Sequence, residues 1–301
     1  MARKTLLSTA ALGAAAMLVL SGCASGGGGD GAAAGGDAQT GGTLKVLSNG
    51  DVDRLDPQLT AYVPVNSVVR SLSRSLLSYQ ASNDVDTRTQ LVGDLATEVP
   101  VPTDDGLTYE ISLREGTTWD APDGSRPIVA EDVARGIERI CNPHIGAALG
   151  GYFINLIEGM TEYCDGFAAV APEAPAMKAY IEANDISGIE TPDEQTVIFH
   201  LVEPASDFTS MLSLPTANPA PVEVLDYLPD SPEYRDNFIA SGPYTVGSYT
   251  PDVKWEFVRN ESWDPKSDDL RKAYVDTIEM TMGVEGDAAM QQLQAGSADM
   301  L

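Results

Sequence analysis

Basic residues, histidines and cysteines are all scarce in this sequence of 301 residues. It has 18 Lys and Arg against 45 Asp and Glu, and the resulting net charge of −27 argues strongly against nucleic acid as a partner. The only two histidines are His144 and His200, and there is no Gly-x-Ser-x-Gly, His-Glu-x-x-His or phosphate-loop motif. We therefore expect no enzyme, no cofactor and no metal site.

Long apolar runs are also lacking, apart from Leu6 to Leu20, which is too short for a comfortable membrane span. The run follows a basic pair, Arg3 and Lys4, and it ends in small residues before Cys23. This pattern looks like a bacterial lipoprotein signal peptide over residues 1–22, with Cys23 as the lipid-bearing N-terminus after cleavage. An ordinary secretory signal followed by a chance cysteine is the alternative.

Residues 23–42 after this signal are nearly all Gly, Ala, Ser, Asp and Thr. Such a composition cannot bury a core, so we expect a flexible tether. The anchor and tether together predict a folded body outside the cell membrane, attached to its outer face by lipid.

Two further cysteines, Cys141 and Cys164, remain in a compartment that permits disulfides. We predict that they pair across the loop 142–163. Two free buried thiols are the alternative.

The stretch from Asp104 to Ile140 has the clearest local pattern. Leu107, Tyr109, Ile111 and Leu113 alternate with polar residues, which is typical of a half-buried strand. A Pro- and Gly-containing loop follows, and from Ala130 the apolar spacing becomes helical. We expect this stretch to be a structural part of the fold rather than a functional site.

Short strands and helices alternate through the rest of the chain, which predicts an α/β or mixed α+β fold. We expect helices over about 65–76, 152–163, 175–184 and 287–293, and strands over about 43–48, 186–190, 196–202, 244–249, 253–259 and 275–282. The short turn 250–252 favours a hairpin, and Asp287 is expected to be a helix N-cap. Residues 297–301 look like the start of another strand.

Several of these segments carry motifs in a recognisable order. They are Leu55-Asp56-Pro57, Arg74 to Tyr79, Asp94-Leu95-Ala96, Asp105 to Tyr109, Leu113 to Gly116, Ala130 to Val133, Asp193 to Leu201, Ser241 to Tyr244, Arg259-Asn260 with Trp263, and Leu293 to Gly296 with Asp299. The chain resembles the peptide- and oligopeptide-type family 5 extracellular solute-binding proteins of ATP-binding-cassette (ABC) importers.

The resemblance implies a type II periplasmic-binding-protein-like fold with several lobes and mixed sheets. Lobe I would be discontinuous, over 43–60 and 186–272, with lobe II over 61–185. Residues 273–301 would only begin lobe III, so we expect a C-terminally incomplete sequence. One departure from the family concerns Val129, which replaces the usual hydroxyl residue before Ala130 and so removes a helix cap.

By the same resemblance, the protein would capture peptides by lobe closure and deliver them to permease and ATPase subunits, as a monomer. The family's cleft-lining segments correspond here to Ala61, Tyr62 and Val63, and to Tyr152 and Phe153. Core packing is the alternative for each aromatic residue. Relatives with this scaffold bind nickel chelates, haem, sugars or opines, so the solute stays open.

Two functions of other classes remain to be separated from this one. An exported lipoprotein hydrolase would cleave a peptide or glycoside panel. A structural surface lipoprotein would show no stabilisation by any solute, whereas a binding protein would.

Overall fold

The computed structural model describes residues 39–301, except Asp53, Tyr62 and Ile145. The predicted signal peptide, the lipidation site Cys23 and nearly all of the tether lie outside the described residues. Residues 39–301 form a single unit. Within this part of the chain, no helix is long and apolar enough to cross a membrane.

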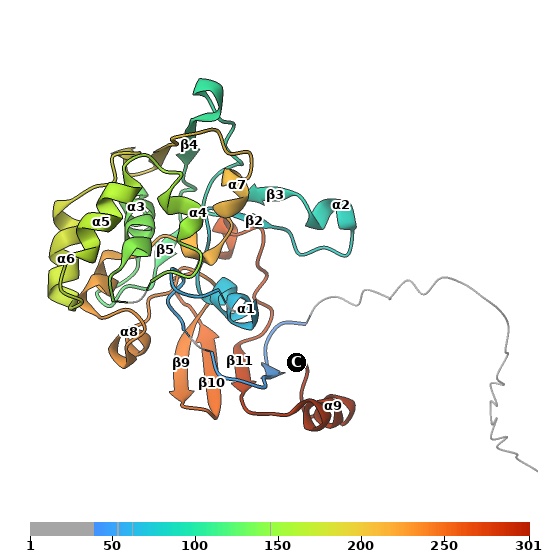
Figure 1. The fold of residues 1–301 in the computed structure, drawn as a ribbon. Helices are drawn as coiled ribbons and strands as arrows, with labels where there is room; N and C mark the ends of the chain where they lie inside the picture. The colour runs from blue at the N-terminus through green and yellow to red at the C-terminus, as the bar shows by residue number, and fades with distance from the viewer. Residues whose placement is uncertain (1–38, 53, 62, 145) are drawn as a thin grey trace, which may run out of the picture. The chain divides into compact units, whose positions relative to one another are not determined.

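Helices and short strands alternate along the described chain, as the sequence predicts (Figure 1). The helices are α1 Val63–Leu72, α2 Val85–Arg88, α3 Ala130–Glu138, α4 Gly151–Ile154, α5 Met160–Ala168, α6 Ala174–Ala183, α7 Phe208–Met211, α8 Pro232–Asp236 and α9 Gly286–Gln294. The strands are β1 Thr43–Leu47, β2 Leu77–Tyr79, β3 Leu91–Gly93, β4 Thr108–Ser112, β5 Thr118–Trp119, β6 Arg126–Pro127, β7 Ile189–Asp193, β8 Thr196–His200, β9 Tyr244–Thr250, β10 Lys254–Arg259 and β11 Thr277–Thr281.

The largest sheet has the strand order β1-β11-β10-β9. β1 runs parallel to β11, with Leu44 opposite Ile278, whereas β9, β10 and β11 are antiparallel neighbours. The predicted hairpin between β9 and β10 turns at Asp252, which has a positive φ of 58°. On the other side of β1, Met300 pairs with Val46 in a single parallel bridge, as expected for the start of another strand.

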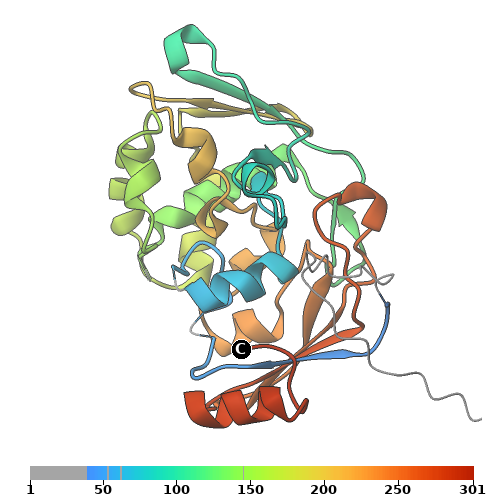
Figure 2. The ribbon, with the colours of Figure 1, turned by 90° about the vertical axis from the view of Figure 1, so that its right-hand side faces the viewer.

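Side chains of β1 alternate between the two faces of this sheet. Val46 packs against the apolar cluster that contains α1, and Leu47 packs against Ala289 of α9. In Figure 2 the blue helix α1 and the red helix α9 accordingly lie on opposite sides of the sheet.

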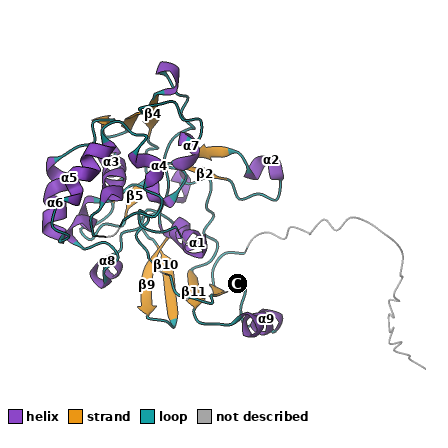
Figure 3. Ribbon diagram, in the orientation of Figure 1, coloured by secondary structure: helices purple, strands orange, loops and turns teal. Residues whose placement is uncertain are grey.

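A second sheet, β4-β8-β7, carries the alternation that the sequence predicts. Tyr109 and Ile111 of β4 and Val197 and Phe199 of β8 are buried, and they belong to the larger core cluster. Helices α3, α5 and α6, whose buried side chains join the same cluster, lie together in Figure 3.

The start of α3 is stabilised without the hydroxyl cap that the family resemblance leads one to expect. Val129 is the N-cap residue, and its side chain accepts no hydrogen bond. The carboxylate of Asp132 instead accepts the Val129 backbone N–H at 3.2 Å and the indole N–H of buried Trp119 at 2.8 Å. One buried carboxylate therefore stabilises the helix start and fixes the orientation of the tryptophan.

The strand expected over 186–190 lies at Ile189–Asp193 instead, and three further predicted boundaries are wrong for tertiary reasons. Helix α1 ends at Leu72 rather than Leu76, because the Leu72 carbonyl accepts the backbone N–H groups of Ser241 and Gly242. The helix expected over 152–163 is split into α4 and α5, because Ile157 between them forms a bridge to Leu201. Glu285, not Asp287, is the N-cap residue of α9.

Cys141 and Cys164 are joined by a disulfide, with their Cα atoms 4.8 Å apart. The bond ties the 3-10 turn after α3 to the middle of α5. Loop-closure entropy for the sequence separation of 23 corresponds to a stabilisation of about 3 kcal/mol.

We expect the Cys141→Ala/Cys164→Ala double variant to lose about 3 kcal/mol of unfolding free energy, because its unfolded chain is no longer cross-linked. Urea unfolding of both proteins measures the loss, and the wild-type protein under reducing conditions is the matched control. Non-reducing peptide mapping that finds both wild-type thiols free would contradict the pairing.

Candidate functional site

The predicted solute-contacting residues have different surroundings in the structure. Ala61 is exposed just before α1, Val63 is the first residue of α1, and Tyr62 lies outside the described residues. Tyr152 on α4 keeps 57% of its surface exposed. Phe153 is 0% exposed and packs in the larger core, so the prediction that it contacts a solute is corrected. Successive helical residues point about 100° apart, which explains why one aromatic side chain points outward and the next inward.

The loop before Ala61 is held by a buried ion pair between Asp56 and Arg139. The two side chains are 0% and 3% exposed, and the Arg139 Nη1 to Asp56 Oδ1 distance is 3.2 Å. Arg139 also donates to the side-chain oxygen of Gln58, whose amide nitrogen donates to the Asn218 carbonyl at 2.7 Å. Asp56 of the Leu55-Asp56-Pro57 motif therefore fixes the position of the loop through its ion pair with Arg139.

The sequence does not reveal Arg139 as the partner of this motif, because many residues separate Arg139 from Asp56 and it looks like an ordinary polar helix residue. Its guanidinium also lies over the ring of Tyr234, 5.7 Å from the centroid. Burial would lower the pKa of Arg139, but the charge of Asp56 outweighs it and raises the pKa, so the guanidinium stays protonated.

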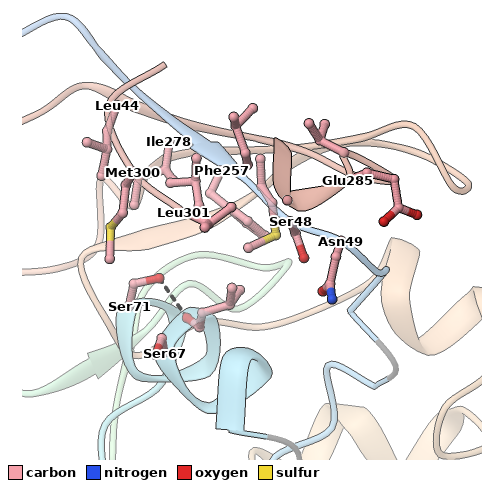
Figure 4. Close-up of a pocket in the computed structure, with 16 residues that line it drawn as sticks. Leu44, Ser48, Asn49, Ser67, Ser71, Phe257, Ile278, Glu285, Met300 and Leu301 are labelled. Atoms are coloured by element: carbon pink, nitrogen blue, oxygen red, sulfur yellow. Dashed lines mark hydrogen bonds between the residues drawn. The ribbon is translucent and has the colours of Figure 1, made fainter. Parts of the chain in front are cut away.

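A cavity of about 500 Å³ lies between α1 and the sheet; we call it the α1 hollow (Figure 4). Leu44, Ile278 and Met300 border it on the sheet side, and Ser67 and Ser71 border it on the helix side. The Ser71 hydroxyl donates to the Val68 carbonyl at 2.6 Å within the helix. Most of the other residues that line the hollow are apolar, so the hollow is predominantly apolar.

A second cavity of about 720 Å³ adjoins the first and shares Leu44, Ser67, Ser71 and Ile278 with it. Because Arg70 lines this second cavity, we call it the Arg70 hollow. Neither hollow is predicted from the sequence. The available signal was that Ser67 and Ser71 of α1, which are exposed and half-buried and lie four residues apart, follow a different helix face from the buried Val65, Val69 and Leu72.

A third hollow, of about 510 Å³, is lined by acidic and aromatic residues that include Glu158, Glu162, Tyr163 and Asp185. Near Tyr163 and Asp185 lies Glu138, which is only 7% exposed. Burial, with smaller contributions from the charges of Asp185 and Glu131, raises the pKa of Glu138 to about 8, although Arg135 opposes the shift. Burial alone accounts for most of this perturbation.

His200 and Asp51 both have structural partners. His200 on β8 is half-buried and contacts the Glu190 carboxylate, with Nε2 and Oε1 3.0 Å apart. Asp51 accepts the Trp255 indole N–H at 2.7 Å and the Tyr249 hydroxyl. Among the described residues, no group of His, Cys, Asp and Glu could hold a metal ion.

Comparison with known proteins finds similarity over most of the described chain. The family model for bacterial extracellular solute-binding proteins, family 5 Middle, matches residues 90–301. The periplasmic oligopeptide-binding protein OppA of Haemophilus influenzae is 24% identical over 237 residues, covering 78% of this chain and 39% of the relative. The probable deoxycholate-binding periplasmic protein YgiS of Escherichia coli is 25% identical over 197 residues, covering 65% of this chain and 33% of the relative.

Solved structures agree with these relatives. Clavulanic acid biosynthesis oligopeptide binding protein 2 has a TM-score of 0.74 and 32% identity, over 87% of this chain and 44% of its own. The chain spans less than half the length of these relatives. The family and the named relatives are binding proteins rather than enzymes.

We expect Arg139→Met to lose about 3–5 kcal/mol of unfolding free energy, because the Asp56 carboxylate stays buried without its counter-charge. Lys178→Met is the matched control, since it removes a surface pair with Asp226 and is expected to cost no more than about 1 kcal/mol. Urea unfolding measures both. Equal losses in the two variants would contradict the anchoring role of Arg139.

Glu138 predicts a specific pH dependence of stability. Because its folded-state pKa is about 8 and its ordinary value is 4.5, only the folded state keeps the proton between these values. Stability from this group is therefore present below about pH 4.5 and is lost as pH rises to about 8.

We expect Glu138→Gln to be more stable than the wild type by up to about 4 kcal/mol at pH 8.5, with the difference shrinking towards pH 5. Denaturant unfolding at a series of pH values measures this difference, with Glu162→Gln as an acidic control from the third hollow. A difference that is independent of pH would contradict the raised pKa.

Proposed function

Since the chain belongs to the bacterial extracellular solute-binding proteins of family 5, we propose that it captures short peptides outside the cell membrane and delivers them to an ABC importer. The observation that carries this proposal is the TM-score of 0.74 with a protein named as an oligopeptide binding protein, at 32% identity. The oligopeptide-binding relative of Haemophilus influenzae supports the same class of solute.

In the proposed mechanism, lobes close around an extended peptide, and the closed form docks on a permease powered by ATPase subunits. Backbone hydrogen bonds hold an extended peptide, and water-filled pockets accept its side chains, which permits broad specificity. The protein acts as a monomer and performs no catalysis. Cys23 carries the lipid after removal of residues 1–22, and the tether 23–42 spaces the binding body from the membrane.

The two main core clusters support a division into lobes. The smaller cluster joins α1 to the largest sheet, and the larger cluster surrounds the β4-β8-β7 sheet. The bounds expected from the sequence are 43–60 with 186–272 for lobe I, 61–185 for lobe II and 273–301 for the beginning of lobe III. The smaller cluster favours placing α1 and β11 with lobe I instead, because α1 packs on the largest sheet and β11 lies between β1 and β10. The boundary at 185/186 then passes between β4 and its partners β7 and β8, so this sheet bridges the two lobes.

Ala61, Tyr62, Val63 and Tyr152 are the proposed solute contacts. The Asp56–Arg139 pair supports this assignment for the first three, because a rigidly anchored loop presents its residues with little loss of entropy on binding. The exposed ring of Tyr152 supports its role, since an accessible aromatic side chain can stack on a peptide.

An amphipathic non-peptide solute is a second candidate. The predominantly apolar lining of the α1 hollow favours it, as does the relative named as a probable deoxycholate-binding protein. Peptides and this class of solute differ in their hydrogen-bonding backbone, so direct binding measurements separate the two functions.

We expect peptide pools of two to six residues to raise the melting temperature, since a ligand at 100 times its Kd adds about 2.7 kcal/mol of stability. Differential scanning fluorimetry with the pools, and mass spectrometry of the co-purifying solute, measure this. Tyr152→Ala should weaken peptide binding about tenfold, whereas Val101→Ala, at a site 83% exposed and outside the proposed contacts, should not.

No stabilisation by any peptide would reject the peptide proposal. Stabilisation by deoxycholate alone would favour the amphipathic solute. Cleavage of the peptide pools would support the hydrolase alternative, and unchanged binding by Tyr152→Ala would remove that residue from the site.

A further inference from the structure

Arg70 lines the Arg70 hollow from α1, next to a wall of apolar and aromatic side chains. Leu270, Tyr274 and Ile278 belong to this wall. One guanidinium nitrogen, Nη2, donates to the Ser78 hydroxyl at 2.6 Å and reaches the Tyr79 carbonyl at 3.5 Å. These contacts hold the guanidinium at the edge of the hollow.

Arg70 is unusual among the described arginines because no carboxylate forms an ion pair with it. Only Arg88, on the exposed helix α2, shares this property within the described ranges. The remaining nitrogens of Arg70, Nε and Nη1, make no hydrogen bond to the described protein atoms. Arg70 is exposed, so a ligand that enters the hollow can reach these free donors.

The neighbouring carboxylates form their ion pairs with other arginines, although Asp94 still attracts Arg70 through space. Asp94 is bound by Arg74 at 2.8 Å and by Arg271 at 2.7 Å, and Asp268 is bound by Arg271 at 3.1 Å. Three arginines therefore face two aspartates, which leaves a local charge of 3 − 2 = +1. Burial, and then the charge of Arg271, lowers the pKa of Arg70, whereas the charge of Asp94 opposes the shift, so an added anion would stabilise the charged guanidinium.

We propose that Arg70 binds the carboxylate of a small organic acid whose apolar part occupies the Arg70 hollow. A carboxylate oxygen can accept from Nε or from Nη1, the two donors of the planar guanidinium that the protein leaves free, and Leu270 and Tyr274 cover the attached apolar group. For a peptide solute, which rests on the proposed function, the group bound is the C-terminal carboxylate. The cavity of about 720 Å³ is large enough for a terminal residue with a large side chain.

The test compares a peptide acid with its C-terminal amide by calorimetry, using the wild type, Arg70→Gln, Arg70→Lys and Arg88→Gln. We expect the wild type to bind the acid at least tenfold more tightly than the amide, because only the acid pairs with the guanidinium. Arg70→Gln should abolish this preference, Arg70→Lys should keep part of it, and Arg88→Gln, the matched control, should keep all of it.

A second ligand, 3-phenylpropionate, tests the site without a peptide. In the wild type it should shift the NMR signals of Tyr274, and in Arg70→Gln it should not. If peptide acid and amide bind the wild type equally, the carboxylate site is wrong while the proposed function stands, and this comparison does not depend on whether any variant folds. If no peptide binds, the proposed function fails, and the presence or absence of the 3-phenylpropionate shift then supports or overturns the carboxylate site.

Discussion

The buried carboxylate of Asp94 holds three separate stretches of the chain together, because it forms ion pairs with both Arg74 and Arg271. Arg74 follows α1, Asp94 follows β3, and Arg271 lies in the turn before β11. Burial by itself would raise the pKa of Asp94, but Arg271 and Arg74 outweigh it and hold the pKa below its usual value. The aspartate therefore stays charged, and α1 is fixed against the segment that leads into the largest sheet.

The ion pairs of Asp94 also affect the charge of the neighbouring surface. By engaging Arg74 and Arg271, Asp94 leaves Arg70 as the third arginine of the cluster, at the edge of a cavity. The ion pairs that stabilise the fold therefore also leave Arg70 available as a candidate binding residue.

Several strands and the hairpin could be predicted from the sequence, because their positions depend on local residue patterns. The alternation from Leu107 to Leu113 predicts β4, and the short turn at 250–252 predicts the hairpin of β9 and β10. The end of α1 could not be predicted in this way, because the Leu72 carbonyl is satisfied by backbone from residues 241 and 242. The family resemblance identified the class of protein, and the family comparison confirms it.

The candidate site was less predictable, since it depends on distant pairings. The sequence marks Asp56 as part of a motif, but only the folded chain identifies Arg139 as its partner. Tyr152 and Phe153 are adjacent aromatic residues with similar patterns around them, yet helix geometry exposes one and buries the other. Arg70 carries no sequence signal, because its significance lies in the carboxylates that its neighbours occupy.

The order of strands in the largest sheet constrains how the chain can acquire its structure. Thr43 of β1 lies opposite Thr277 of β11, and Val46 bridges to Met300, so both neighbours of the first strand are very distant from it in sequence. Such long-range pairing requires closure of a very long loop before any contact forms, which slows folding. Until then β1 has two unpaired edges, and these are open to other chains. A strand whose two neighbours are both distant in sequence is therefore exposed to wrong pairing for longer than the strands of a local hairpin such as β9 and β10.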